Sequence, residues 1–443
     1  MLKLSMFSIL PFLNNCYKKL LTHRYGLSLC IYLGAAAISG IVCVFFMHAF
    51  DFVYTYRLNN VRVGYWCWLT TPLLFLAAVE LIRLAAPCAD GAGIPQTIFA
   101  AQHLSESNFK SLSPLISFRT MTIKIAALLI GVWGGASTGR EGPSVHITAC
   151  LFFGITWALH RILKLPFSMR SAIVGGAAAG LAAAFNTPLA GVTFAVEELS
   201  SDYFSSIKDM VLMAIIVAGI AAKTLTGEYT YFGHLNTSAS ISIIAIFSVG
   251  LASGLAGTLF STLLIKGKQA LSILSGWQRY ISIFILALAV LFIAMVSGLK
   301  GIMGPGNLIA QNYLQGDTST PPFFFAITKA AATLFTYWSG IAGGIFAPSL
   351  AMGSAVGAWT ATLQHAPVAA CAALGMAAFL SGAIQAPITS FVIIYEMTGH
   401  PQLLLPIMLA SLIGYMVAKA CKTQHLYQAL SKSYNHLLSS SPG

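Results

Sequence analysis

Charged side chains are scarce in this chain: Asp, Glu, Lys and Arg make up 8% of its 443 residues, against about a quarter in typical soluble domains. Acids are the scarcer sign, with 12 Asp and Glu against 24 Lys and Arg. So few charges exclude a water-exposed surface. Hydrophobic residues make up 57% and the mean hydropathy is +0.80, so we predict an integral membrane protein. The net charge of +12 does not indicate nucleic acid binding, because the basic residues are scattered and gather mainly at the chain ends.

Acids are missing from both ends of the chain, and the basic residues there predict its orientation. The first acid is Asp51 and the last is Glu396. The basic residues outside them include Lys3, Lys18, Lys19, Arg24, Lys419, Lys422 and Lys432. By the positive-inside rule both termini are cytoplasmic, and the chain crosses the membrane an even number of times. Residues 1–28 lack a small-residue cleavage site after their short apolar run, so we interpret them as a retained cytoplasmic or interfacial segment.

Paired cysteine motifs are also absent. The eight cysteines show no CxxC spacing and no pairing with histidines. This pattern predicts neither disulfide nor metal chemistry, so we expect the cysteines to fill the core and the protein to need no cofactor.

The longest uncharged stretch, residues 330–395, contains no Asp, Glu, Lys or Arg. As one helix it would be about 100 Å long, far more than a bilayer needs, so it must turn back several times. Its glycines and prolines, Gly343, Gly344, Pro348, Pro367 and Pro387, indicate where. Broken backbone inside a membrane is tolerated only in protein or along an aqueous cavity, which is where transporters and channels build ion sites.

An internal repeat is present. Residues 133–144 can be laid on residues 338–349 with Trp, two Gly, Pro and Ser coinciding. Glu197 and Glu396, which are separated by nearly the same number of residues as these two segments, each follow a proline by nine residues. Two matches in one order indicate a duplicated half, and paired broken helices in two halves point to a transport site.

Gly-rich turns with a proline close behind occur at 91–95, 139–143 and 344–348. Each predicts a helix N-terminus with free backbone N–H groups and the positive end of the helix dipole. Partial positive charges suit a small anion that must leave quickly. The alternative for any one of them alone is an ordinary helix kink.

These three motifs, GAGIP, GREGP and GGIFAP, resemble in their order the signature of the CLC family of chloride channels and chloride/proton exchangers. The resemblance covers about residues 29–430 and includes the stretch 176–198 and the pair Leu426-Tyr427. It implies an all-α polytopic inverted repeat of tilted, broken and re-entrant helices that forms a homodimer with one anion pathway in each subunit. The transmembrane domain would span 29–425, with halves at about 30–225 and 239–425, before a short cytoplasmic tail at 426–443.

The resemblance also assigns roles to single residues. Glu141 matches the external gating glutamate, whose carboxylate occupies an anion site until it is protonated; the alternative is an acid that stabilises a helix N-terminus. Arg140 is then a structural ion-pair partner. Tyr427 matches the tyrosine that donates to the central anion, although its position alone also fits an interfacial aromatic. Lys124 matches a lysine near the pathway, or it reaches water from a helix end.

The remaining anion ligands implied by the resemblance are Ala92, Gly93, Ile345 and Phe346. The family usually has Ser at the position of Ala92 and Glu at the position of Gln96. Loss of the hydroxyl donor puts the preference for chloride over nitrate in question.

The adjacent acids Glu197 and Glu198 point about 100° apart on a helix, so they cannot share one role. Glu197 is repeated as Glu396, which predicts a symmetric architectural function. By resemblance, Glu198 is the internal proton-transfer glutamate of exchangers; the alternative is a solvated acid at the end of a span.

We therefore predict a secondary transporter, and no enzyme, that exchanges chloride for protons across the inner cell membrane. A passive anion channel of the same fold is the main alternative. A remote one is an intramembrane serine hydrolase, because residues 135–139 fit the GxSxG pattern around Ser137. That motif needs a preceding strand, whereas residues 124–133 read as a helix.

Overall fold

The computed structural model describes residues 6–60, 64–164, 168–199, 204–227, 231–233, 235, 241–299 and 301–439, and the side chains discussed below lie within residues 26–199 and 208–438 of these. The first half contains α1 (Met6–Asn60), α2 (Cys67–Ala85), α3 (Ile94–His103), α4 (Phe109–Leu112), α5 (Phe118–Trp133), α6 (Glu141–Leu163), α7 (Met169–Phe185), α8 (Pro188–Phe194) and α9 (Phe204–Thr226). The second half contains α10 (Ile243–Ser272), α11 (Gly276–Ser297), α12 (Asn307–Leu314), α13 (Pro322–Trp338), α14 (Phe346–Gln364), α15 (Val368–Ile384), α16 (Pro387–Thr398), α17 (Leu404–Ala420), α18 (Leu426–Ser431) and α19 (His436–Ser439). The predicted all-α fold is confirmed, and the described residues contain no strand, only two isolated backbone bridges.

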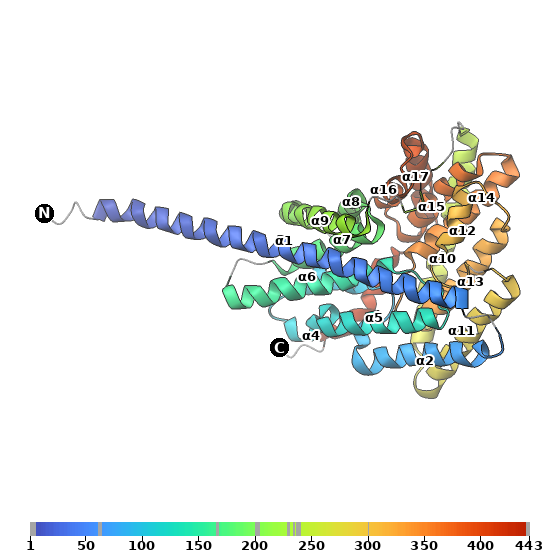
Figure 1. Ribbon diagram of the computed structural model, residues 1–443, viewed down its shortest axis with the longest axis horizontal. Helices are drawn as coiled ribbons and strands as arrows, with labels where there is room; N and C mark the ends of the chain where they lie inside the picture. Colours follow the sequence, from blue (N-terminus) through green and yellow to red (C-terminus); the bar gives the residue numbers. More distant parts are fainter. Residues whose placement is uncertain are drawn as a thin grey trace.

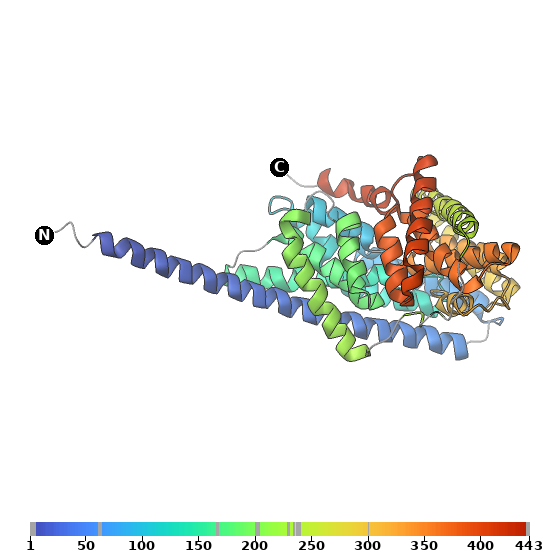
Figure 2. The ribbon, with the colours of Figure 1, turned by 90° about the horizontal axis from the view of Figure 1, so that it is seen from above.

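Helix α1 is 55 residues long and extends far beyond the rest of the bundle (Figures 1 and 2). It runs through residue 28 without a break, so the predicted boundary there has no counterpart in the backbone and the division stays a prediction. The side chains of Lys3, Lys18, Lys19 and Arg24 lie outside the described residues.

The helices are those of a multi-pass membrane protein. Within the described residues, eight helices are long and apolar enough to cross a bilayer. Large apolar side chains such as Phe45, Leu73 and Ile244 are more than half exposed, which suits contact with lipid.

The uncharged stretch 330–395 turns back on itself, as predicted. Helix α13 ends at Trp338, α14 begins at Phe346, and further breaks precede Val368 and Pro387. The small side chains of this region allow α14 and α15 to pack closely: a Cβ added at Gly357 would lie 2.1 Å from the carbonyl oxygen of Cys371. The broken helices are therefore buried in protein.

The two halves are related by a local twofold axis. Gly139 and Gly344, which are equivalent in the repeat, donate a backbone hydrogen bond to each other as an antiparallel pair, at 2.8 and 2.9 Å. When two equivalent residues each donate an N–H to the carbonyl of the other, a local twofold axis passes between them. The two halves of the repeat are therefore oriented in opposite directions. The sequence predicts the duplication, and the inversion is the one that the resemblance to the CLC family implies.

Glu197 and Glu396 follow the same symmetry. The Glu197 carboxylate accepts from the N–H groups of Ile388 and Thr389 at the start of α16. The Glu396 carboxylate accepts from those of Leu189 and Ala190 at the start of α8. Each acid therefore caps a helix of the opposite half, which is the architectural role expected from its repetition.

None of the seven cysteines whose side chains are described forms a disulfide, but the expectation that they fill the core is wrong for two of them. Cys43, Cys67, Cys150 and Cys371 are buried, whereas Cys30 and Cys421 are exposed.

Candidate anion and proton site

The three Gly-rich turns meet near the local twofold axis. In addition to the Gly139–Gly344 pair, the Gly343 N–H donates to the Gly91 carbonyl at 3.0 Å. The approach is so close that it requires glycine: a Cβ on Gly142 would lie 2.8 Å from the carbonyl oxygen of Ala92. The turns at 91–95, 139–143 and 343–348 therefore bring the N-termini of α3, α6 and α14 together.

The predicted anion ligands lie at two of these N-termini. Ala92 and Gly93 precede α3, and Gly93 has a φ of +91°, which favours glycine. Ile345 and Phe346 begin α14. Ala92, Ile345 and Phe346 are almost completely buried, so the positive ends of both helix dipoles lie in a medium where they act strongly on an anion.

Glu141 is the first residue of α6 and is completely buried. Its Oε1 accepts a hydrogen bond from the Tyr231 hydroxyl at 3.2 Å, and its Oε2 has no partner among the described residues. The neighbouring Arg140 forms an ion pair with Asp51 and donates to the carbonyl of Met47, at 3.2 Å, so its guanidinium is directed toward α1.

Two further predicted residues approach from other elements. Glu198 lies in a π-helical turn, Ala195–Leu199, and is 6% exposed, so it is not a solvated acid. Tyr427 lies on α18 and is buried, and its hydroxyl has no partner among the described residues. The charges of Glu198 and Glu141 both act on this hydroxyl. A buried hydroxyl without a partner is a donor available to a bound anion.

Lys124 does not reach water, so the helix-end alternative is wrong. It is completely buried, and its Nζ donates to the carbonyls of Asp90 and Gly91, both at 3.0 Å. Lys124 therefore supports the turn that precedes α3. Its equivalent in the repeat, Lys329, donates in the same way to the carbonyls of Gly301, Ile302 and Gly304 before α12. The signal for Lys329 in the sequence is the offset of 205, which aligns Lys124 with Lys329 as it aligns Trp133 with Trp338.

A cluster around Asp90 was also missed. Its carboxylate pairs with Lys268 at 3.1 Å and accepts from the Tyr434 hydroxyl at 3.0 Å. Gln96 donates from its amide to the Asp90 carbonyl at 2.6 Å. Burial and the adjacent carboxylate raise the pKa of the Tyr434 hydroxyl well above its ordinary value, so it stays a donor. These residues and Ala92 line a cavity of about 450 Å³ beside α3.

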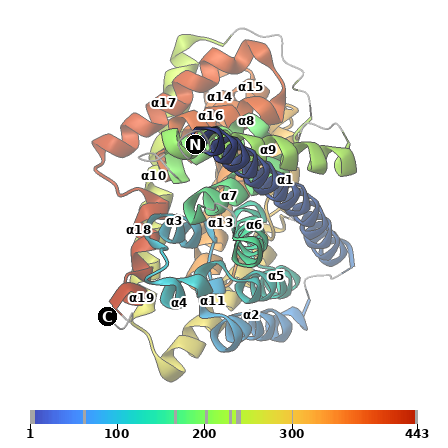
Figure 3. The same ribbon diagram turned by 90° about the vertical axis from the view of Figure 1, so that its left-hand side faces the viewer.

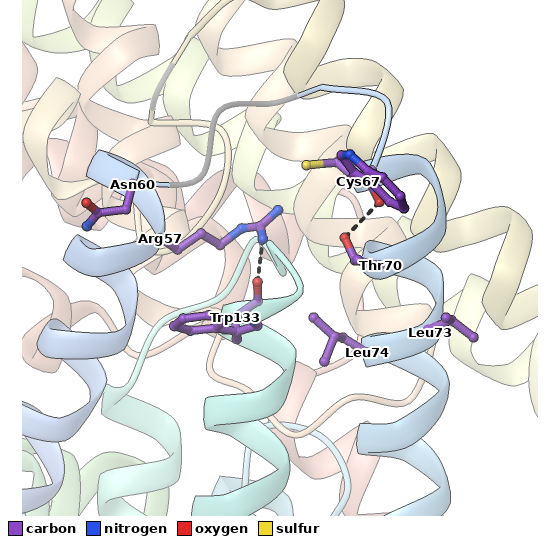
Figure 4. A pocket seen from close by; sticks show the side chains of 8 residues that line it. Arg57, Asn60, Cys67, Thr70, Leu73, Leu74 and Trp133 are labelled. Carbon is purple, nitrogen blue, oxygen red and sulfur yellow. Dashed lines mark hydrogen bonds between the residues drawn. The ribbon is translucent and has the colours of Figure 1, made fainter.

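A second cavity, of about 600 Å³, lies apart from these residues (Figure 4). The buried Arg57 of α1 points into this region and donates to the Trp133 carbonyl at the end of α5. A cation at a helix C-terminus is favourable, so Arg57 joins the ends of α1 and α5. The cavity contains none of the predicted site residues.

The environment of Ser137 does not favour a hydrolase. Its hydroxyl is hydrogen-bonded to that of Thr333 at 2.9 Å, and its N–H donates to the Thr336 hydroxyl. The motif follows helix α5, where a nucleophile of this type needs a strand. The described residues also contain no group of three His, Cys, Asp or Glu side chains that could hold a metal ion.

Comparison with known proteins agrees with this arrangement. A family described as "Voltage gated chloride channel" matches residues 73–419. The H(+)/Cl(-) exchange transporter ClcA of Salmonella arizonae is 30% identical over 93% of this chain and 90% of its own length. The same transporter of Salmonella newport shows the same identity and coverage.

Solved structures share the fold. A slow cyanobacterial Cl-/H+ antiporter superposes with a TM-score of 0.78 at 24% identity, over 94% of this chain and 99% of the other. A CLC-type fluoride/proton antiporter gives 0.71 at 21% identity, over 89% and 96%. The extent of the family match, together with the converging helix N-termini, the buried Glu141 and the inverted repeat, leads to one conclusion: this chain belongs to the voltage gated chloride channel, or CLC, family.

Proposed function

We propose that this protein is a secondary transporter that exchanges chloride for protons across the membrane. The observation that carries the proposal is the buried Glu141 carboxylate at the N-terminus of α6, beside the N-termini of α3 and α14. A carboxylate at a helix N-terminus lies near the positive end of the helix dipole, which also attracts a chloride ion. The curated ClcA relatives, which are named as exchangers, support the same assignment.

Glu141, Glu198 and Tyr427 have different roles in the proposed exchange. A deprotonated Glu141 competes with chloride for the dipole ends, and protonation removes the charge that holds it there. Chloride then passes along the N-termini of α3 and α14 and accepts a hydrogen bond from Tyr427. Glu198, which is also buried, transfers the proton to and from Glu141. One carboxyl thus carries the proton and opens the path for the anion.

The anion ligands bear on selectivity. Ala92 supplies a backbone group but no hydroxyl, so the central site holds chloride by the amides of the helix ends and by Tyr427. We propose weak discrimination between chloride and nitrate, because a small, strongly hydrated anion loses more from a missing donor. No cofactor enters this mechanism.

We further propose that two copies of the chain pair through α8, α9, α16 and α17, which gather on one side of the bundle (Figure 3). Helix α8 has seven residues, about 10 Å, and cannot reach both membrane surfaces. Its Leu189 is 59% exposed, and Ile388 of α16 is 47% exposed, so apolar side chains near the ends of these helices are uncovered in a single chain. A second copy would shield the ends of these short helices from lipid.

The pairing is tested by native mass measurement in detergent. We expect a mass of two chains, and a shift toward one chain for Leu412→Trp on α17. Ile285→Trp on α11, a similarly exposed position on the opposite side, is the matched control and should leave the mass unchanged. A wild-type mass of one chain would contradict the dimer.

For orientation, we propose an inner-membrane protein with both termini in the cytoplasm. The N-terminal part of α1 and the short α19 lie toward the same end of the bundle (Figure 1). The basic residues at both ends of the sequence favour the cytoplasmic side for that end.

The function is tested with purified protein in chloride-loaded liposomes, with chloride efflux and external pH recorded together. An exchanger moves protons inward as chloride leaves, and it drives protons against their own gradient when chloride supplies the energy. Chloride efflux without any proton movement would instead identify a passive channel, and no efflux of either ion would contradict both functions.

A further inference from the structure

One hydrogen bond at the gating glutamate has no role in the mechanism above. The Tyr231 hydroxyl donates to Oε1 of Glu141 at 3.2 Å, although the two residues are 90 positions apart in the sequence. Tyr231 belongs to the segment that joins the two halves of the repeat. The linker between the halves therefore places a donor directly on the carboxylate that carries the proton.

The position of Tyr231 is set by its neighbours. Its ring packs edge-on against Phe185, with centroids 5.5 Å apart, and against Phe232, at 4.9 Å. The Phe232 N–H donates to the Met397 carbonyl near the end of α16, at 3.3 Å. The linker is thus attached to the second half of the protein on one side while the tyrosine packs against α7 of the first half.

The direction of the hydroxyl is set by Asn307, the first residue of α12. Its side-chain amide donates to the Tyr231 oxygen. A hydroxyl has one hydrogen to donate, and a lone pair that accepts from Asn307 leaves that hydrogen directed toward Glu141. Asn307, Tyr231 and Glu141 therefore form a chain of hydrogen bonds that ends on the carboxylate. Such chains strengthen their members in a buried setting.

We propose that Tyr231 and Asn307 act as a clamp that holds the deprotonated Glu141 in its blocking position and thereby sets the pH at which the gate opens. The proposal rests on the proposed gating function of Glu141. A donor to a carboxylate favours the charged form over the neutral one, so the clamp must be broken, or weakened, when a proton arrives. Tyr231 and Asn307 are positioning residues, because they act through Glu141.

Other charged or titratable groups near Glu141 do not replace the clamp. Arg140 is ion-paired with Asp51. The charge of Glu141 acts on Tyr427 and Cys43, but the Tyr427 hydroxyl has no partner among the described residues and the Cys43 thiol donates to the Gly180 carbonyl. In the part of the chain that the structure describes, Tyr231 is the one side chain bonded to the Glu141 carboxylate.

The test is the pH dependence of chloride efflux from liposomes. Tyr231→Phe keeps the ring but removes the donor, so the charged carboxylate is less favoured and protonates at a higher pH. We expect the midpoint of efflux against pH to rise by about one unit, or about 1.4 kcal/mol, with the maximal rate at low pH retained. Asn307→Leu should move the midpoint in the same direction by less. Tyr313→Phe is the matched control, because this buried hydroxyl donates to the Thr320 carbonyl instead.

Two results would overturn the clamp. One is an unchanged midpoint in Tyr231→Phe. The other is a pH midpoint that persists in protein carrying Glu141→Gln and that Tyr231→Phe still shifts, because that protein has no carboxylate to hold. A purely structural role would lower the rate at every pH and leave the midpoint in place.

A second measurement does not depend on transport. The infrared carboxyl band of Glu141, identified by its loss in Glu141→Gln, can be titrated directly in wild type and in Tyr231→Phe. The clamp requires the band to titrate at higher pH in Tyr231→Phe. Absence of chloride flux in wild type would contradict the proposed function, whereas an unshifted infrared titration would contradict the clamp.

Discussion

Glu197 and Glu396 provide a quantitative test of the inverted repeat. Each carboxylate accepts two backbone N–H groups at the start of a helix from the opposite half, at 3.0 and 2.6 Å for Glu197 and at 3.1 and 2.8 Å for Glu396. A hydrogen bond to a charged group contributes about 1.5–3 kcal/mol, and a charge at a partly buried helix N-terminus up to about 2 kcal/mol. These contributions overlap, because both describe the same carboxylate.

Replacing either acid with Gln keeps its shape and one acceptor but removes the charge and one strong hydrogen bond. We therefore expect Glu197→Gln and Glu396→Gln each to cost about 2 kcal/mol, and to cost the same within a factor of about two. For a chain of this size such a loss lowers the apparent melting temperature by roughly a few degrees. The proton-to-chloride ratio should not change, because both carboxylates are bonded to the N-termini of α16 and α8 and neither is bonded to Glu141.

The assay is thermal unfolding in detergent, followed by transport at matched protein recovery. Glu106→Gln is the control, since Glu106 is exposed and should lose little. A wild-type melting temperature in Glu197→Gln would refute the capping argument. So would a large difference between the two equivalent variants, or loss of proton coupling at unchanged stability.

Further predictions concern the pathway itself. Glu141→Gln cannot titrate, so chloride flux should continue without proton movement and without dependence on pH; an unchanged proton-to-chloride ratio in liposomes would remove Glu141 from the mechanism. Glu198→Gln should keep chloride transport but lose proton pumping against a gradient, and pumping at the wild-type rate would contradict a proton-transfer role for Glu198. Ala92→Ser restores a hydroxyl beside the α3 N-terminus and should increase chloride affinity several-fold to about tenfold; equal affinities by calorimetric titration would show that backbone amides and Tyr427 already satisfy the ion.

The membrane-spanning character, the broken helices and the duplicated half could be predicted from the sequence alone, because the relevant constraints are local. A bilayer penalises every charged residue and every unpaired backbone group, so the uncharged run at 330–395 had to break at its glycines and prolines. The repetition of Glu197 as Glu396 likewise predicted a shared structural role. The structure shows that each carboxylate accepts hydrogen bonds from a helix of the opposite half. Glycine patterns identified the helix ends, since only glycine permits the close approach of those turns.

The surroundings of Glu141 could not be predicted from the sequence. Tyr231 lies in a linker with no motif, and it reaches Glu141 only because the linker is attached at Met397 and its ring packs on Phe185. The sequence allowed Lys124 to lie near a pathway or to reach water from a helix end. In the structure it is buried and donates to two carbonyls of a turn that is far from it in the sequence. A motif records what a residue requires of its immediate neighbours along the chain. Which distant group provides a proton donor or a carbonyl depends on how the two halves pack against each other, and only the tertiary structure decides that.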